Sequence, residues 1–155
     1  MKKGIFILFI AMLGLIYCHP IQNNRTIKNQ QTIDSVVMFL NAFGVESDGF
    51  PYIDATIDFK HNSSDCKVHY DNPKYKDSTY SLTIQEMKEI LKLLQSVRLD
   101  TLKKEFKYGP TDQPTSTTTI YTSTGKFTIS DYGLQAEYPL NELYKIVYKL
   151  KENFR

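Results

Sequence analysis

The stretch "YIDATIDF", from Tyr52 to Phe59, alternates strictly between apolar and polar residues, and this pattern limits the fold more than any other feature of the chain. A period of two is that of a β-strand with one buried face and one solvated face. The "HNSSD" segment from His61 is typical of a turn, and "CKVHY" from Cys66 is typical of a returning strand. The sequence therefore predicts an antiparallel hairpin, followed by a third short strand over "STYSL" from Ser78.

Two further strands are predicted near the C-terminal end of the chain. Thr115 to Thr122 and Lys126 to Tyr132 are rich in threonine, β-branched and aromatic residues, which favour strands. The "STG" segment between them is typical of a three-residue hairpin turn with Gly125 in the left-handed conformation. The connection from residue 98 to 109 is expected to be irregular and anchored by apolar side chains at Leu99, Leu102 and Phe106.

Three segments show the spacing of amphipathic helices. The clearest is "TIQEMKEILKLLQSV", in which Thr83 and Glu86 form a capping box. A second helix is predicted for residues 32–44, with Thr32 as its cap and Gly44 at its end. The third is "YPLNELYKIVYKLKENF", where Pro139 suits the first turn. Together with the strands, these helices predict an α+β domain with an antiparallel sheet of four to five strands and helices packed on one face, in two strand–strand–helix units.

The first 18 residues have the pattern of a secretory signal peptide. Lys2 and Lys3 precede an uncharged apolar run that is shorter than the roughly 20 residues of a bilayer span. Residues 19–31 are polar and rich in Asn and Gln, so we expect a flexible tether there, and residues 32–155 are predicted to be the single folded domain. The protein is accordingly expected to be exported to the periplasm, or anchored to the outer membrane, including the cell surface.

The end of this signal, "LIYC", resembles the lipobox of bacterial lipoproteins, in which the cysteine is lipidated. Cys18 would then carry the lipid, which would be the protein's one attachment to a membrane. Tyr17 departs from the pattern, since a small residue usually precedes the cysteine. Ordinary cleavage nearby, giving an unlipidated exported protein, therefore stays open.

Charge argues against a nucleic-acid partner. The chain has 19 Lys and Arg and 17 Asp and Glu. Loss of Lys2 and Lys3 with the signal would leave 17 of each and no positive field to displace counterions from a phosphate backbone.

Most of the chain resembles a known family. "TDQPT" followed by a hairpin, "SDYG" and a helix that starts with proline is similar to an uncharacterised family of small exported proteins, many of them lipoproteins, of Gram-negative bacteria. The similarity covers roughly residues 52 to 150 and implies export and the fold, with no established activity. Its T-D-x-P-T … D-Y pattern lies at Thr111, Asp112, Pro114, Thr115, Asp131 and Tyr132.

Asp112 and Asp131 are the candidate site residues. Asp131 continues the buried face of "KFTISDY" by the period of two, so its carboxylate is expected at the edge of the core, where it needs hydrogen bonds. One hypothesis makes the two carboxylates an acid–base or cation-binding pair. The favoured interpretation is structural: Asp131 accepts amides of the 110–115 loop, and Asp112 makes a turn within it.

The remaining chemistry is sparse. Cys66 and His69 would point to opposite faces of a strand, so no metal site is expected, and no cofactor motif or Gly-x-Ser-x-Gly elbow occurs. We therefore expect no catalytic residues and a non-catalytic accessory or interaction module of the cell envelope, with an envelope protein or a glycan as its partner. A small hydrolase or a cation-dependent binding protein that uses Asp112 and Asp131 remains the alternative.

Overall fold

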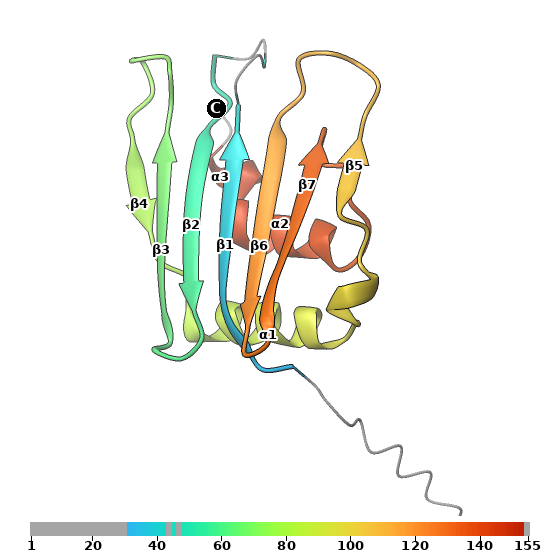
Figure 1. Cartoon of the computed structure of the whole chain (residues 1–155). Coiled ribbons are helices and arrows are strands. Elements are labelled where there is room, and N and C mark those ends of the chain that lie inside the picture. Colours follow the sequence, from blue (N-terminus) through green and yellow to red (C-terminus); the bar gives the residue numbers. More distant parts are fainter. Residues whose placement is uncertain (1–30, 43–44, 46–47, 154–155) are drawn as a thin grey trace, which may run out of the picture.

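The computed structural model describes residues 31–42, 45 and 48–153. The predictions for the signal peptide, the tether, Cys18 and Gly44 lie outside these residues. Within them, one seven-stranded sheet has the order β4-β3-β2-β1-β6-β7-β5 (Figure 1). The strands are β1 (Ile33–Asn41), β2 (Tyr52–Asp58), β3 (Ser63–His69), β4 (Ser78–Tyr80), β5 (Glu105–Lys107), β6 (Thr115–Thr122) and β7 (Gly125–Tyr132).

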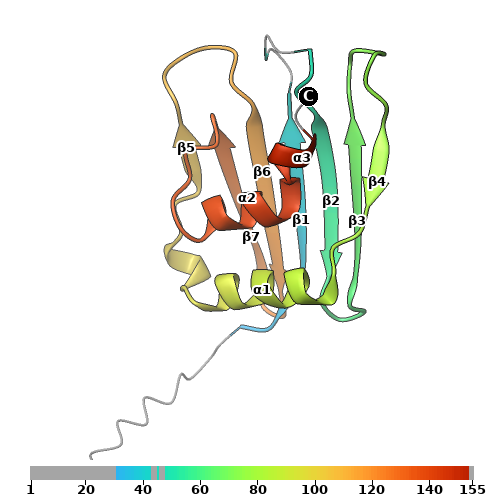
Figure 2. The same cartoon turned by 180° about the vertical axis from the view of Figure 1, so that it is seen from behind.

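The helices all lie on one face of this sheet, as Figure 2 shows. They are α1 (Ile84–Gln95), α2 (Leu140–Tyr148) and α3 (Leu150–Asn153), with a short 3-10 helix η1 (Leu99–Thr101). The predicted α+β class is confirmed, although the sheet has more strands than the four to five expected. It is also mixed, because β5 pairs with β7 in parallel. In the described part of the chain no helix has the length and apolar character needed to cross a membrane.

The predicted helix over residues 32–44 is wrong, because this segment forms β1, the central strand. The register against β6 shifts between Ile33 and Ser35, as at a β-bulge. Ile33 and Val36 can therefore both face the core, although a regular strand would place them on opposite sides. The three-residue spacing of these buried side chains is also typical of a helix. The residues after them follow the strand period, with Met38 and Leu40 buried.

Two other differences concern short elements. β5 was predicted to be part of an irregular connection, but its three residues pair with β7, and Phe106 packs against the core. The β6–β7 turn is also tighter than expected: Thr122 pairs with Gly125, so two residues form the loop. Gly125 starts β7 with a φ of 152°, outside the left-handed helical region.

The predicted C-terminal helix is broken in two by Lys149, which ends α2 with a φ of 47°. The Lys149 ammonium lies 2.7 Å from the Glu86 carboxylate in the first turn of α1. Glu86 also completes the predicted capping box with Thr83. The ion pair thus ties the end of α2 to the start of α1 above the core, which fills the space between helices and sheet.

Candidate functional site

The loop before β6 carries most of the sequence pattern, and it docks onto the end of β7. The Gln113 amide donates to the Tyr132 hydroxyl at 3.2 Å, and the Gly133 amide donates to the Pro114 carbonyl at 2.8 Å. Thr115 then pairs with Tyr132 at the start of β6. The loop is therefore held in place by its main-chain groups, which bond to the Tyr132 hydroxyl and to the main chain of β7 and Gly133, rather than by its aspartate.

Gly133 permits this docking. Its φ is 87°, and a Cβ added at this position would lie 2.6 Å from the Cβ of Tyr108. Real side chains do not approach so closely, and non-glycine residues seldom adopt such a conformation. The glycine that follows Asp131 and Tyr132 is therefore required by both the turn and the loop that packs against it.

Asp131 is completely buried, deeper than the edge of the core where the strand alternation predicted it. One carboxylate oxygen accepts the Gln135 amide and the other accepts the Ala136 amide, each at 2.8 Å. The donors thus belong to the turn after β7, and not to the 110–115 loop that was expected to supply them. Both oxygens of this carboxylate are engaged in closing the β7–α2 connection.

Asp112 occupies a different environment. Its side chain is exposed, it accepts a 2.9 Å hydrogen bond from the Thr111 hydroxyl, and its φ is 65°. Aspartate tolerates this left-handed conformation better than most residues. Since one carboxylate lies in solvent and the other is sealed inside the protein, the structure does not bring Asp112 and Asp131 together as a pair.

A layer of hydroxyl groups surrounds Asp131 inside the core. Ser116 pairs with Asp131 across the strands, and its hydroxyl lies 2.7 Å from that of Tyr148 on α2. The buried hydroxyls of Thr118 and Tyr144 have no hydrogen-bond partner among the described residues. Burial raises the pKa of Tyr144 and of Tyr148 well above the usual value. This polar layer is closed to solvent, and nothing in the sequence pattern had indicated it.

His69 lies at one end of the open face of the sheet, in a cluster that the sequence analysis missed. Its Nδ1 is 2.8 Å from an Asp77 oxygen, and Asp77 also accepts the Tyr70 amide. The Tyr52 hydroxyl donates to Asp71 at 2.7 Å. The hydrogen bond with Asp77 raises the pKa of His69. His69, Asp71 and Asp77 are exposed and Tyr52 is half-buried, and the contacts tie the β3–β4 connection to the ends of β2 and β3. Cys66 faces the core instead, and burial raises the pKa of its thiol to about 11.

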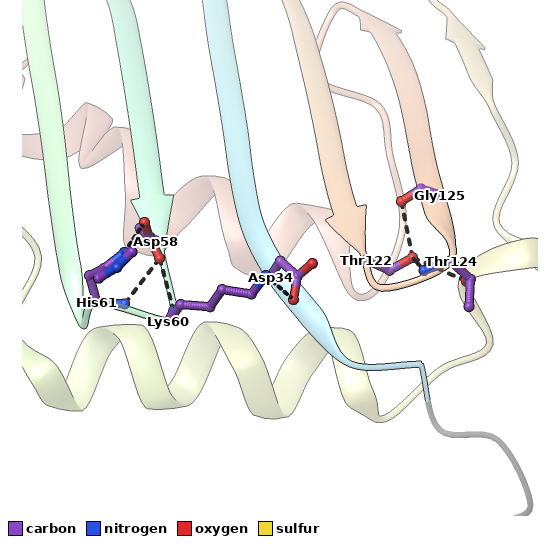
Figure 3. Close-up of polar contacts among 7 residues, drawn as sticks. All are labelled: Asp34, Asp58, Lys60, His61, Thr122, Thr124 and Gly125. Carbon is purple, nitrogen blue, oxygen red and sulfur yellow. Dashed lines mark hydrogen bonds and ion pairs between the residues drawn. The ribbon is translucent and has the colours of Figure 1, made fainter.

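A second polar group holds the turns at the opposite end of the sheet (Figure 3). Asp58 accepts the amides of Lys60 and His61 and lies 2.7 Å from the His61 ring, whose hydrogen bond lowers the pKa of Asp58. Lys60 reaches across to Asp34 on β1 at 3.2 Å. In the neighbouring β6–β7 turn, the Thr122 hydroxyl donates to the Gly125 carbonyl. Each of these contacts holds a turn in place. The oxygens of Asp58, Asp34 and Gly125 that accept them are therefore already occupied.

Two clefts lined by described residues lie on the helical side. One of about 440 Å³ is lined by η1, β5 and the 135–140 segment, including Lys103, Phe106 and Tyr138. The other, of about 480 Å³, lies beside α2 and α3. Neither is lined by Asp112, Asp131 or His69. In residues 31–42, 45 and 48–153, no group of three or more His, Cys, Asp or Glu side chains is arranged to hold a metal ion.

These features define an α+β domain in which the pattern aspartates lie apart. Helices cover one face of its sheet, and no described residue forms an element that covers the other, which we call the bare face. The chain belongs to DUF6438, a domain family of unknown function, whose match covers residues 52–151. This match starts at β2, so the central strand β1 precedes it. No curated protein and no solved structure matches the chain.

Proposed function

We propose that this chain is an exported protein of the cell envelope whose folded domain is a non-catalytic interaction module. The module binds a partner protein through the bare face of its sheet. The observation that carries the proposal is the uncharged centre of this face, where Val37 and Phe39 are 37% and 38% exposed on the central strand.

The pairing register arranges this face in rows across the sheet. One row runs Asp65, Thr56, Val37, Thr119, Thr128, and the adjacent row runs Lys67, Asp54, Phe39, Thr117, Ser130. The charged side chains of these rows lie on β2 and β3, and none occurs at the positions on β1, β6 and β7. Antiparallel sheets often leave one face in water, but they then usually carry polar residues there, so two adjacent large apolar side chains on the middle strand favour a contact surface.

Charged residues surround this centre, as at the rim of protein interfaces. The β2–β3 side carries Asp54, Asp58 and Asp65 against one lysine, Lys67. The fitting partner is therefore a protein with an uncharged central surface and a basic rim toward β2 and β3. A glycan fits less well, because Tyr52 and Tyr121 lie toward opposite ends of the face and form no continuous aromatic platform.

The geometry of the carboxylates supports a non-catalytic role. A general acid or base must reach the proton that it transfers, whereas Asp131 is buried with both oxygens bonded to amides. The alternative is a hydrolase or a cation-binding protein that uses Asp112 and Asp131 together. The geometry does not support it, because the two carboxylates do not form a pair.

Site-specific photo-crosslinking tests the binding face. A photoreactive residue at Thr117 is expected to crosslink one defined protein in envelope extracts, whereas the same residue at Lys88, on the exposed side of α1, is not. With the purified partner, Thr117→Arg should abolish binding and leave the melting temperature unchanged, and Lys88→Glu should bind as the wild type does. Crosslinking to a second copy of the chain would identify that copy as the partner. Full binding by Thr117→Arg, or retention on purified glycan alone, would contradict the proposal.

Export and anchoring are tested separately. The N-terminal sequence of residues 1–18 supports removal of a signal peptide, with lipid on Cys18. Mass analysis of the mature N-terminus is expected to show cleavage before Cys18 and the mass of an attached lipid, and cell fractionation should place the protein in the envelope. An intact Met1 in the mature protein would contradict export by this signal.

A further inference from the structure

The cleft beside α2 and α3 has features of a ligand site that are independent of the bare sheet face. Its volume of about 480 Å³ falls in the range of roughly 300–1,000 Å³ that is usual for small-molecule sites. Leu134, Tyr144 and Leu150 give it an apolar wall. Three lysines and one asparagine complete the lining, at Lys145, Lys149, Lys151 and Asn141.

Two residues of this cleft have a backbone conformation that is unfavourable for their side chains. Four non-glycine residues in the described part of the chain have positive φ angles. Asn62 and Asp112 are of types that tolerate the left-handed conformation. The other two, Leu134 at 52° and Lys149 at 47°, do not suit it, and both line this cleft. Strained residues of this kind concentrate at functional sites, because the strain holds side chains in positions that relaxed backbone would not give.

The charge of the cleft is positive. The Lys149 ammonium forms an ion pair with the Glu86 carboxylate at 2.7 Å. The carbon chain of Lys149, rather than its ammonium, is therefore available to a ligand in the cleft. Lys145 pairs with Glu142 at 2.6 Å, but both side chains are exposed, and such a surface pair is weak enough to exchange for another anion. Lys151 is exposed, and no salt bridge joins it to a carboxylate of residues 31–42, 45 or 48–151.

We propose that this cleft binds an amphiphilic anion, a molecule with one unbranched apolar chain and a carboxylate or phosphate head. The apolar chain would lie against Leu134, Tyr144 and Leu150, where burial of its surface drives binding. The head would bind the ammonium groups of Lys145 and Lys151 through charge-assisted hydrogen bonds. This activity goes beyond partner binding, because the cleft lies on the helical side of the sheet.

Calorimetric titration of the mature protein with laurate, kept below its micelle concentration, tests the proposal. Laurate is expected to bind, and dodecanol, which has the same chain without the charge, should bind roughly tenfold more weakly. Lys145→Gln combined with Lys151→Gln should remove this difference, whereas Lys88→Gln on α1 should preserve it. Both lysines are largely exposed, so the double variant should keep its fold.

A second variant tests the apolar wall. Leu134→Gly removes a wall residue and relieves its left-handed strain, so the variant should fold and bind both laurate and dodecanol more weakly. Equal affinity for laurate and dodecanol in the wild type, or unchanged laurate binding in the double lysine variant, would overturn the proposal.

Further binding measurements distinguish a free amphiphilic anion from a lipid of a membrane. Binding of monomeric laurate indicates a free amphiphile. Sedimentation with phosphatidylglycerol vesicles but not with phosphatidylcholine vesicles, in the absence of laurate binding, indicates a bilayer lipid with the same chemistry. Failure to bind laurate and both kinds of vesicle would overturn the proposal, while leaving the sheet-face experiment unaffected.

Discussion

Asp131 places a carboxylate in the core, where an unsatisfied charge would be costly. The amides of Gln135 and Ala136 meet this requirement, and in doing so they fix the turn that leads from β7 to α2. This residue therefore couples the last strand to the helix that covers the sheet.

Replacing Asp131 by Asn should destabilise the domain by about 2–3 kcal/mol, because one amide acceptor becomes a donor that faces another donor. The free energy of unfolding in urea measures this loss. Asp112→Asn is the matched control and should change stability by less than about 0.5 kcal/mol, since the side chain is exposed and asparagine also tolerates a positive φ. Equal stability of the wild type and Asp131→Asn would contradict the structural role.

Gly133→Ala should cost about 1–3 kcal/mol, because the new Cβ meets Tyr108 and the backbone has a positive φ. Gly109→Ala, in the same loop region, is the control: nothing lies within 4 Å of its added Cβ. Thermal unfolding of the two variants side by side tests the difference. A similar melting temperature for both would show that the loop does not dock against Gly133.

The sequence predicted part of this region. The strand period predicted that the Asp131 side chain is on the core side, because alternation depends only on local geometry, but it placed the carboxylate at the edge of the core and not fully inside. It could not identify the amide donors, since which turn folds back toward a carboxylate depends on the path of the chain after β7. The cluster of His69 with Asp77 was missed for the same reason: eight residues separate the partners, and the β3–β4 connection brings them together.

Among the helices and strands, those with a clear local sequence pattern were predicted correctly. The α1 capping box and the β2–β3 hairpin were predicted because their patterns are contained in a few neighbouring residues. β1 was mistaken for a helix because a bulge gave its buried residues a three-residue spacing. β5 has only three residues, and its parallel pairing with β7 is a long-range contact that leaves no period in the sequence. The break between α2 and α3 at Lys149 likewise could not be predicted, because no glycine or proline occurs there.

The ion pair that joins α1 to α2 should make the free energy of unfolding depend on pH. Burial acts to raise the pKa of Glu86, but hydrogen bonds from Lys149 and Thr83 outweigh it, so the folded-state pKa lies below the ordinary 4.5. A lowered pKa stabilises the folded state above the unfolded-state pKa, and this contribution is lost as the pH falls through the folded-state value.

Glu86→Gln should therefore lower the free energy of unfolding by about 1 kcal/mol at pH 7. The difference from the wild type should shrink as the pH falls below 4.5. Urea unfolding from pH 7 to pH 3 measures it. Glutamine can still cap α1, so the variant isolates the ion pair, and Glu89→Gln on the exposed side of α1 is the control. A difference that stays constant over this pH range would contradict the assignment.

At the level of the whole molecule, β1 has paired strands on both sides, whereas β4 and β5 are three-residue edges. Hydrogen exchange should follow this order, because amides in the middle of a sheet open only with global unfolding. We expect the slowest exchange in residues 36–40 and the fastest strand exchange in β4 and β5, as measured by mass spectrometry of peptide fragments. Exchange of β1 as fast as that of β4 would contradict its central position.

The position of β1 also affects how the chain acquires its structure. Ile33, near the start of β1, pairs with Thr122, 89 residues later, and contacts so distant in sequence slow folding. A ribosome that has released the first four strands has therefore produced only half of a sheet, whose middle strand still lacks a neighbour. The sheet can therefore be completed only when the last third of the chain has been synthesised.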